Sequence, residues 1–106
     1  MRIVGIRAVS KALDISWREA FTILSNYARA RGVMMNSVDS IEAFLDDNFE
    51  RFCINDITVR EFARIYNKGI FLVTMRNHIT TIIDGTIYDT FDPSSRIVWC
   101  AWIVEN

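Results

Sequence analysis

Residues 70–91 decide the fold of this chain, and they read IFLVTMRNHITTIIDGTIYDTF. The first six residues, Ile70–Met75, are largely apolar at both alternating sets of positions, which is typical of a strand buried on both faces. Two β-branched runs follow, His78–Ile83 and Thr86–Thr90, and Asp84-Gly85 joins them. Asp-Gly favours a two-residue type I′ turn, because both central residues of that turn need positive φ angles. The stretch therefore predicts a buried strand followed by a β-hairpin.

The turn also predicts which side chains of the hairpin meet. With Asp84 and Gly85 at the centre of the turn, counting outward along the two strands places His78 opposite Phe91 and Thr80 opposite Asp89. These four side chains share one face, because neighbouring residues of a strand alternate between faces. Asp89 is then a diagonal neighbour of His78, at a backbone separation of about 7–8 Å that two side chains can bridge.

His78 is the only histidine in the chain, and its predicted neighbour gives it a candidate role. An aspartate beside an imidazole selects its tautomer and favours its charged form, as the base and its orienting carboxylate do in a nucleophilic triad. Asp92, just past the strand, is a second candidate partner, whereas Asp84 is assigned to the turn. A lone histidine at a strand start is more often structural than catalytic, so both interpretations stay open.

The N-terminal half carries helix signals. Capping boxes at Ser16-Trp17-Arg18-Glu19 and Thr58-Val59-Arg60-Glu61 predict one helix that runs to a stop at Gly32 and another that runs to about Tyr66. Shorter apolar-faced segments around Ile6–Leu13 and Ile41–Leu45 predict two further helices. A last strand is predicted at Arg96–Val104. Helices first and an antiparallel sheet afterwards indicate an α+β fold, a single domain over residues 1–106 with N-terminal helices packed on a small antiparallel sheet.

Composition narrows the class of protein. Hydrophobic residues make up 51% and charged residues 24% of the 106 residues, and the formal net charge of -1 does not indicate nucleic acid or an anionic membrane as a partner. No stretch approaches the roughly 18 apolar residues of a membrane helix, and the N-terminal apolar run is too short for a signal peptide, so a cytoplasmic protein is expected. No zinc spacing and no cofactor motif occurs. For Cys53 and Cys100, in apolar surroundings, two buried free thiols are favoured over a disulfide.

Five segments in order along the chain resemble a papain-like family of bacteria and their phages: Gly5–Leu13, Ile15–Ala20, Ile57–Ala63, Asn67–Val73 and Asn77–Asp92. Members of that family read Cys-x-x-Arg-Ala-Leu at the first segment and Thr-Val-x-Glu-Phe at the third. At the last they read Gly-His-x-Thr-Ala-x-x-Asp-Gly-x-x-Tyr-Asp-Thr-Trp-Asp, which is the most specific match. The resemblance implies a small papain-like cysteine-peptidase fold, with the histidine and an aspartate of the active site on the hairpin.

The same resemblance places Val4 where the family has its nucleophilic cysteine. A valine cannot attack a carbonyl, so the resemblance implies a pseudoenzyme, with His78, Asp89 and Asp92 as remnants of the site. We therefore expect a catalytically inactive domain that binds a protein partner, for example a phage-encoded anti-defence inhibitor of a CRISPR nuclease. The alternative is a hydrolase in which His78 and Asp89 act as a general base on water, which is worth roughly 10²–10⁴ in rate.

Overall fold

The computed structural model describes residues 3–32, 38–54 and 56–105, and it gives the backbone but not the side chains of residues 3–4 and 38–40. Four helices and five strands occur in these residues: α1 (Ile3–Leu13), α2 (Trp17–Arg31), α3 (Val38–Asn48), β1 (Glu50–Phe52), α4 (Val59–Ile65), β2 (Ile70–Met75), β3 (His78–Ile83), β4 (Thr86–Tyr88) and β5 (Cys100–Glu105). The helices all fall where the sequence predicts them.

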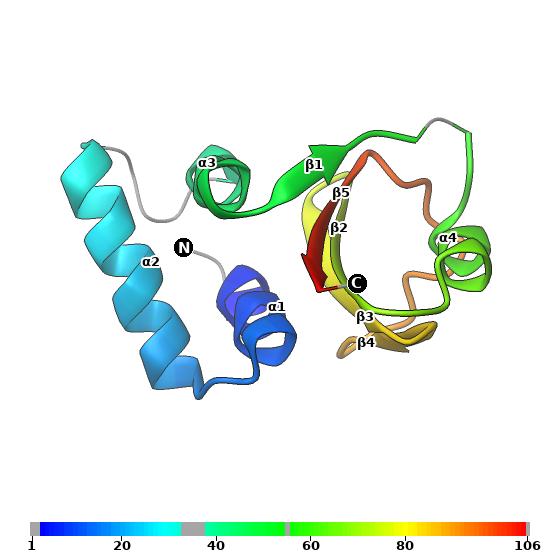
Figure 1. The fold of residues 1–106 in the computed structure, drawn as a ribbon, viewed down its shortest axis with the longest axis horizontal. Helices are drawn as coiled ribbons and strands as arrows, with labels where there is room; N and C mark the ends of the chain where they lie inside the picture. The colour runs from blue at the N-terminus through cyan, green and yellow to red at the C-terminus, as the bar shows by residue number, and fades with distance from the viewer. Residues whose placement is uncertain (1–2, 33–37, 55, 106) are drawn as a thin grey trace.

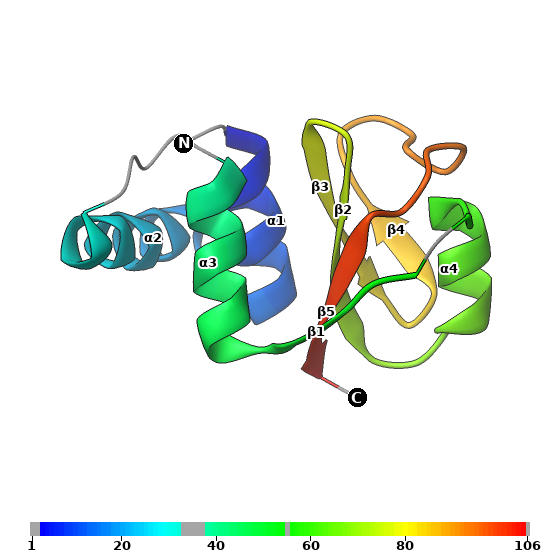
Figure 2. The ribbon, with the colours of Figure 1, turned by 90° about the horizontal axis from the view of Figure 1, so that it is seen from above.

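The strands form one antiparallel sheet in the order β1-β5-β2-β3-β4, and helices cover both of its faces. Figure 2 shows α1, α2 and α3 on one side of the sheet and α4 on the other. The predicted α+β class, with N-terminal helices on an antiparallel sheet, is confirmed. The position of α4 on the second face is a feature that the sequence pattern does not indicate.

The predicted hairpin register is confirmed. Ile83 pairs with Thr86 and Thr81 with Tyr88, so Asp84 and Gly85 are the two turn residues, with φ angles of 48° and 80°. β4 is shorter than predicted and ends at Tyr88. Both central turn residues have the positive φ that a type I′ turn requires.

Both predicted capping boxes form. The Ser16 hydroxyl accepts from the Glu19 amide at 3.0 Å, and the Thr58 hydroxyl accepts from the Glu61 amide at 3.1 Å. Each glutamate in turn accepts from the backbone amide of its capping residue, so two free amide groups at each helix start are satisfied. Gly32 ends α2 in the left-handed region, at φ 68°.

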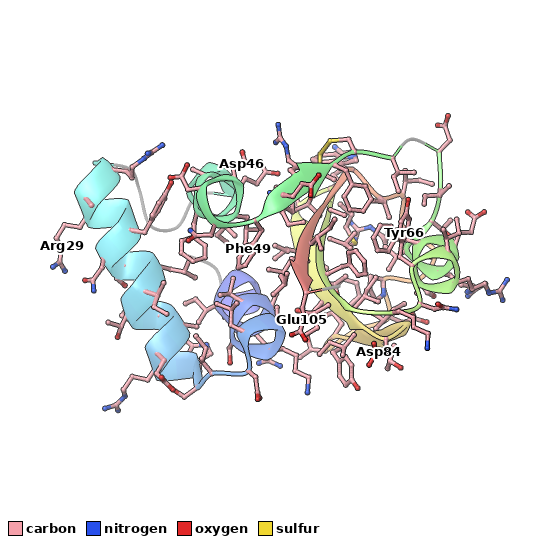
Figure 3. All side chains as sticks on the ribbon, viewed as in Figure 1. Arg29, Asp46, Phe49, Tyr66, Asp84 and Glu105 are labelled. Atoms are coloured by element: carbon pink, nitrogen blue, oxygen red, sulfur yellow. A yellow bond between two sulfur atoms is a disulfide. The ribbon has the colours of Figure 1, made fainter. Side chains whose placement is uncertain are left out.

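The sheet separates two hydrophobic clusters. The cluster on the side of α1–α3 includes Ile6, Val9, Leu24, Leu45, Leu72 and Trp102. The cluster on the side of α4 includes Val59, Phe62, Phe71, Val73, Met75 and Ile82. Tyr66 adds its ring to the second cluster, between α4 and the sheet (Figure 3). Residues next to each other in β2 therefore serve opposite clusters, as strand alternation requires.

The cysteines differ from the expectation of two buried free thiols. Cys53 and Cys100 form a disulfide, with their Cα atoms 4.3 Å apart, and Cys53 is exposed. β1 pairs with β5 through Phe52 and Ala101, and the next opposed pair in that register is Cys53 and Cys100. The pairing depends on β1, a three-residue strand that the sequence does not predict, and this is why the expectation was wrong.

The predicted last strand is also shifted. β5 begins at Cys100 instead of Arg96, and residues 96–98 contact the segment before α4. Ile97 forms an isolated antiparallel bridge with Thr58, and the Val98 amide donates to the Ile57 carbonyl at 2.9 Å.

None of the helices in the described part of the chain has the length and apolar character to span a bilayer.

Candidate functional site

His78 and Asp89 meet as the hairpin register predicts. The distance between His78 Nε2 and Asp89 Oδ2 is 2.7 Å. His78 is the first residue of β3, and Asp89 is the first residue after β4. The hairpin turn therefore fixes the pair, because it sets the register of both strands.

The pair is closed to solvent. The side chains of His78 and Asp89 are 7% and 5% exposed. The ring of Phe91 lies 4.3 Å from the imidazole, measured between ring centroids, and it is tilted against the imidazole by 48°. A substrate would have to displace Phe91 or neighbouring backbone to reach the histidine ring.

Asp89 is held by several donors at once. Its Oδ2 atom faces His78, and its Oδ1 atom accepts from the amide of Thr90 at 2.7 Å and from that of Phe91 at 3.4 Å. Burial alone would raise the pKa of Asp89, but hydrogen bonds from Thr80, His78 and the Thr90 backbone outweigh it and lower the pKa below its usual range. The carboxylate is therefore charged at neutral pH, and both of its oxygens accept hydrogen bonds.

The imidazole and α1 lie on opposite faces of the sheet. Ile79 belongs to the cluster on the α1 side, and the Thr81 hydroxyl donates to the Ala8 carbonyl of α1 at 2.7 Å. His78 alternates with Ile79 and pairs with Met75, which belongs to the α4-side cluster. The sheet thus lies between the helix that would carry a nucleophile and the histidine that would activate it.

Val4, at the expected nucleophile position, is in the first turn of α1. Its side chain lies outside the described part of the structure. Both cysteines of the chain are in the disulfide, so no free thiol is present to serve as a thiolate. Among the described residues, no group of three or more histidine, cysteine or acidic side chains could hold a metal ion.

Asp92, the second candidate partner of His78, has a different role from Asp89. Its Oδ1 atom accepts from the Ser94 amide at 3.0 Å, and these hydrogen bonds to Ser94 lower the pKa of the carboxyl. Asp92 is exposed, and its described contacts are with the turn that follows it. The structure therefore brings Asp89, and not Asp92, to His78.

Asp84 is a turn residue, as expected, but it also forms a contact that the sequence does not reveal. Its Oδ1 atom accepts from the Gly69 amide at 2.9 Å, and its own amide donates to the Gly69 carbonyl at 2.9 Å. The hairpin turn is thereby fixed to the chain just before β2. This double contact helps to position the strands that carry His78 and Asp89.

Two partly exposed aromatic side chains of α2 form a second candidate site. Trp17 and Phe21 stack with ring centroids 5.4 Å apart and planes 13° from parallel, and they are 45% and 38% exposed. They are one helical turn apart, so both project from the same side of α2. Composition indicated an aromatic-rich chain, but only the structure shows which rings remain outside the core.

No family model matches the chain, and no curated protein or solved structure shows significant similarity to it. The papain-like resemblance therefore stays a prediction, and no family is assigned.

Proposed function

We propose that this chain is a non-catalytic protein-binding domain in which the His78–Asp89 pair stabilises the hairpin. The closure of the pair carries the proposal, since the two side chains are 7% and 5% exposed and bonded to each other. A general base has to come within hydrogen-bonding distance of the proton it removes. The imidazole already contacts a carboxylate and the Phe91 ring.

The stacked pair of Trp17 and Phe21 supports the binding half of the proposal. Single exposed apolar side chains are normal on protein surfaces, whereas adjacent exposed aromatic rings offer a rigid apolar area to a partner. Tryptophan is among the residues most enriched at binding hot spots.

The papain-like resemblance supports the proposal through the hairpin alone. A working site of that kind needs its nucleophile and histidine on the same side of the sheet, and α1 lies on the side opposite the imidazole. An inherited hairpin that keeps its histidine–aspartate contact for stability is consistent with both observations. An anti-defence inhibitor is the specific version that the resemblance suggests, and it stays a prediction.

The test is affinity capture with matched surface variants. The full chain is immobilised, exposed to bacterial lysate, and the captured proteins are identified by mass spectrometry and retitrated in purified form. We expect one saturable partner, with capture weakened in the Trp17→Ser, Phe21→Ser double variant and retained in Ile65→Ser. Ile65 is a suitable control because it is 62% exposed on α4, on the other side of the sheet. Equal capture by all three proteins would contradict a role for α2.

The 2.7 Å contact between His78 and Asp89 also supports a second candidate function, hydrolysis with the pair as general base. This candidate predicts slow turnover of activated esters or peptides that disappears in His78→Gln. Under the non-catalytic proposal, any background turnover is the same in the wild-type protein and in His78→Gln. Turnover that depends on His78 would overturn the non-catalytic proposal.

A further inference from the structure

A small hollow lies between α1 and the β3–β4 edge of the sheet. It has a volume of about 220 Å³ and is lined by Arg7, Ala8, Lys11, Ile79, Tyr88 and Asp89. The first three residues are on α1, and the other three are on β3, on β4 and directly after β4. α1 lies alongside this part of the sheet in Figure 1. The hollow is separate from the imidazole of His78, which points to the opposite face.

Arg7 and Lys11 place two positive charges at this hollow. Arg7 and Lys11 are one helical turn apart, so their side chains project from the same side of α1. The side chain of Arg7 is exposed and makes no hydrogen bond or ion pair with any other residue that the structure describes. The Lys11 ammonium lies 4.3 Å from the centroid of the Tyr88 ring, a cation–π contact that orients it.

The acidic residue of the hollow does not neutralise these cations directly. Both carboxylate oxygens of Asp89 already accept hydrogen bonds, from His78 and from the Thr90 and Phe91 amides. Its negative charge does reduce the local positive potential. Two positive charges and the one negative charge of Asp89 leave a surplus of one positive charge at the hollow, which a single carboxylate balances.

The size of the hollow limits its occupant. Sites for whole small molecules are typically about 300–1,000 Å³, and this hollow is smaller, at about 220 Å³. Its apolar lining, Ala8, Ile79 and the Tyr88 ring, suits the methylene groups of one side chain. An arginine fork matches a carboxylate geometrically and can bind it through two parallel hydrogen bonds.

The location of the hollow indicates that the side chain arrives on an extended polypeptide. β4 is an edge strand, and among the described strands it pairs with β3 alone. Its outer edge presents backbone groups to which an extended segment can add. Tyr88, the last residue of β4, lines the hollow and is 42% exposed.

We propose that this hollow receives a glutamate side chain from an extended segment of the protein partner, with the carboxylate on Arg7 and Lys11. This rests on the protein-binding function proposed above. The methylene groups of the glutamate contact Ile79 and Tyr88, and the segment that carries it lies along the outer edge of β4.

The test uses N-acetyl-glutamate N-methylamide as the probe and its glutamine counterpart as the uncharged control. Titration of the isotope-labelled full chain, followed by amide nuclear magnetic resonance, should give saturable shifts at Ala8, Lys11 and Tyr88 in the millimolar range. The glutamine probe should give no saturable shift there. Equal shifts with both probes, no shift with either, or tighter binding of inorganic phosphate at these residues would each overturn the proposal.

Substitution of single basic residues distinguishes binding of glutamate by Arg7 and Lys11 from nonspecific attraction to the positive charges of the protein. Arg7→Gln and Lys11→Gln should each weaken glutamate binding about two- to fivefold, the range of one exposed ion pair, and the double variant should abolish saturable shifts. Arg64→Gln removes an exposed arginine from α4 and should leave the titration unchanged. A loss of similar size in Arg64→Gln would overturn the assignment, because it would indicate nonspecific electrostatics.

The two proposals fail in different ways. If a partner is captured from lysate but Arg7→Gln, Lys11→Gln binds it as tightly as the wild-type protein, the glutamate site is wrong and the binding function stands. If the probe binds at the hollow and no partner is captured, the hollow is a carboxylate site but the protein-binding function is wrong.

Discussion

The two edge strands of the sheet end in similar ways but are held by different chemistry. β1 and β4 each contain three residues, and in each case the next residue links to the neighbouring strand. Cys53 follows β1 and bonds to Cys100 of β5, whereas Asp89 follows β4 and bonds to His78 of β3. The difference shows that a short edge strand, with few ladder hydrogen bonds of its own, can be fixed at its end by either a covalent bond or a side-chain hydrogen bond.

The two links also differ in exposure. Cys53 is exposed, while the side chains of His78 and Asp89 are nearly closed to solvent. A covalent bond keeps its strength in water, but a hydrogen bond to a charged carboxylate is stronger where water is excluded. The β1 edge is therefore expected to respond to reduction, and the β4 edge to acid.

Loss of the disulfide should have the largest effect on stability. The bond joins residues 47 positions apart, and removal of a link of this kind typically costs about 2–4 kcal/mol of unfolding free energy. Cys53→Ser, Cys100→Ser should therefore unfold at a lower urea concentration than the wild-type protein. The control is reductant, which should lower the wild-type midpoint and leave the serine variant unchanged. A wild-type midpoint that does not move on reduction would show that β1 is held by its backbone pairing alone.

Removal of the Asp89 carboxylate should have the second-largest effect on stability. Asp89→Ala leaves the buried imidazole without its acceptor and the Thr90 and Phe91 amides without theirs, and a lost hydrogen bond to a charged group costs about 1.5–3 kcal/mol. Asp89→Asn keeps one oxygen acceptor and should lose less. Urea unfolding with both variants measures the difference. Equal losses would mean that the negative charge of the carboxylate, and not the shape or the remaining amide oxygen, matters at this position.

The sequence predicts the β4 edge better than the β1 edge, for a physical reason. The contact between His78 and Asp89 depends on a two-residue turn between them, so local turn chemistry and strand alternation determine it. The disulfide depends on β1, whose sequence Glu50-Arg51-Phe52 has no alternating pattern and becomes a strand only by pairing with β5. Such pairing between distant segments is not encoded in local propensity.

The same distinction applies to the remainder of the fold and the candidate sites. The capping boxes are local and were predicted at the correct residues. The placement of α4 on the second face of the sheet and the hollow beside Arg7 depend on tertiary contacts. The closure of His78 by Phe91 is an intermediate case, because the register predicted that they would oppose each other but not that the ring would cover the imidazole.

Lowering the pH should reduce the stability of the β4 edge gradually, whereas substitution of Asp89 removes its contribution at once. The pKa of Asp89 is lowered in the folded protein from an ordinary value of 3.8. A group whose pKa falls on folding stabilises the protein above its unfolded pKa, and this contribution is lost as pH falls through the folded pKa. Urea midpoints measured from pH 5 downward should therefore decline less steeply in Asp89→Asn than in the wild-type protein. Parallel declines would assign the acid sensitivity to other carboxylates.

Asp92→Asn should have the smallest effect on stability. Asp92 is exposed and accepts from the Ser94 amide in its own turn, a bond that an asparagine side-chain oxygen can also accept. Its urea midpoint should move less than that of Asp89→Asn, although the two aspartates are only three positions apart. The imidazole resonances of His78 provide a second readout, since they should shift in Asp89→Asn and stay in place in Asp92→Asn. If instead Asp92→Asn moved them, the histidine would have a second carboxylate partner, and the β4 edge would be held by a network and not by one pair.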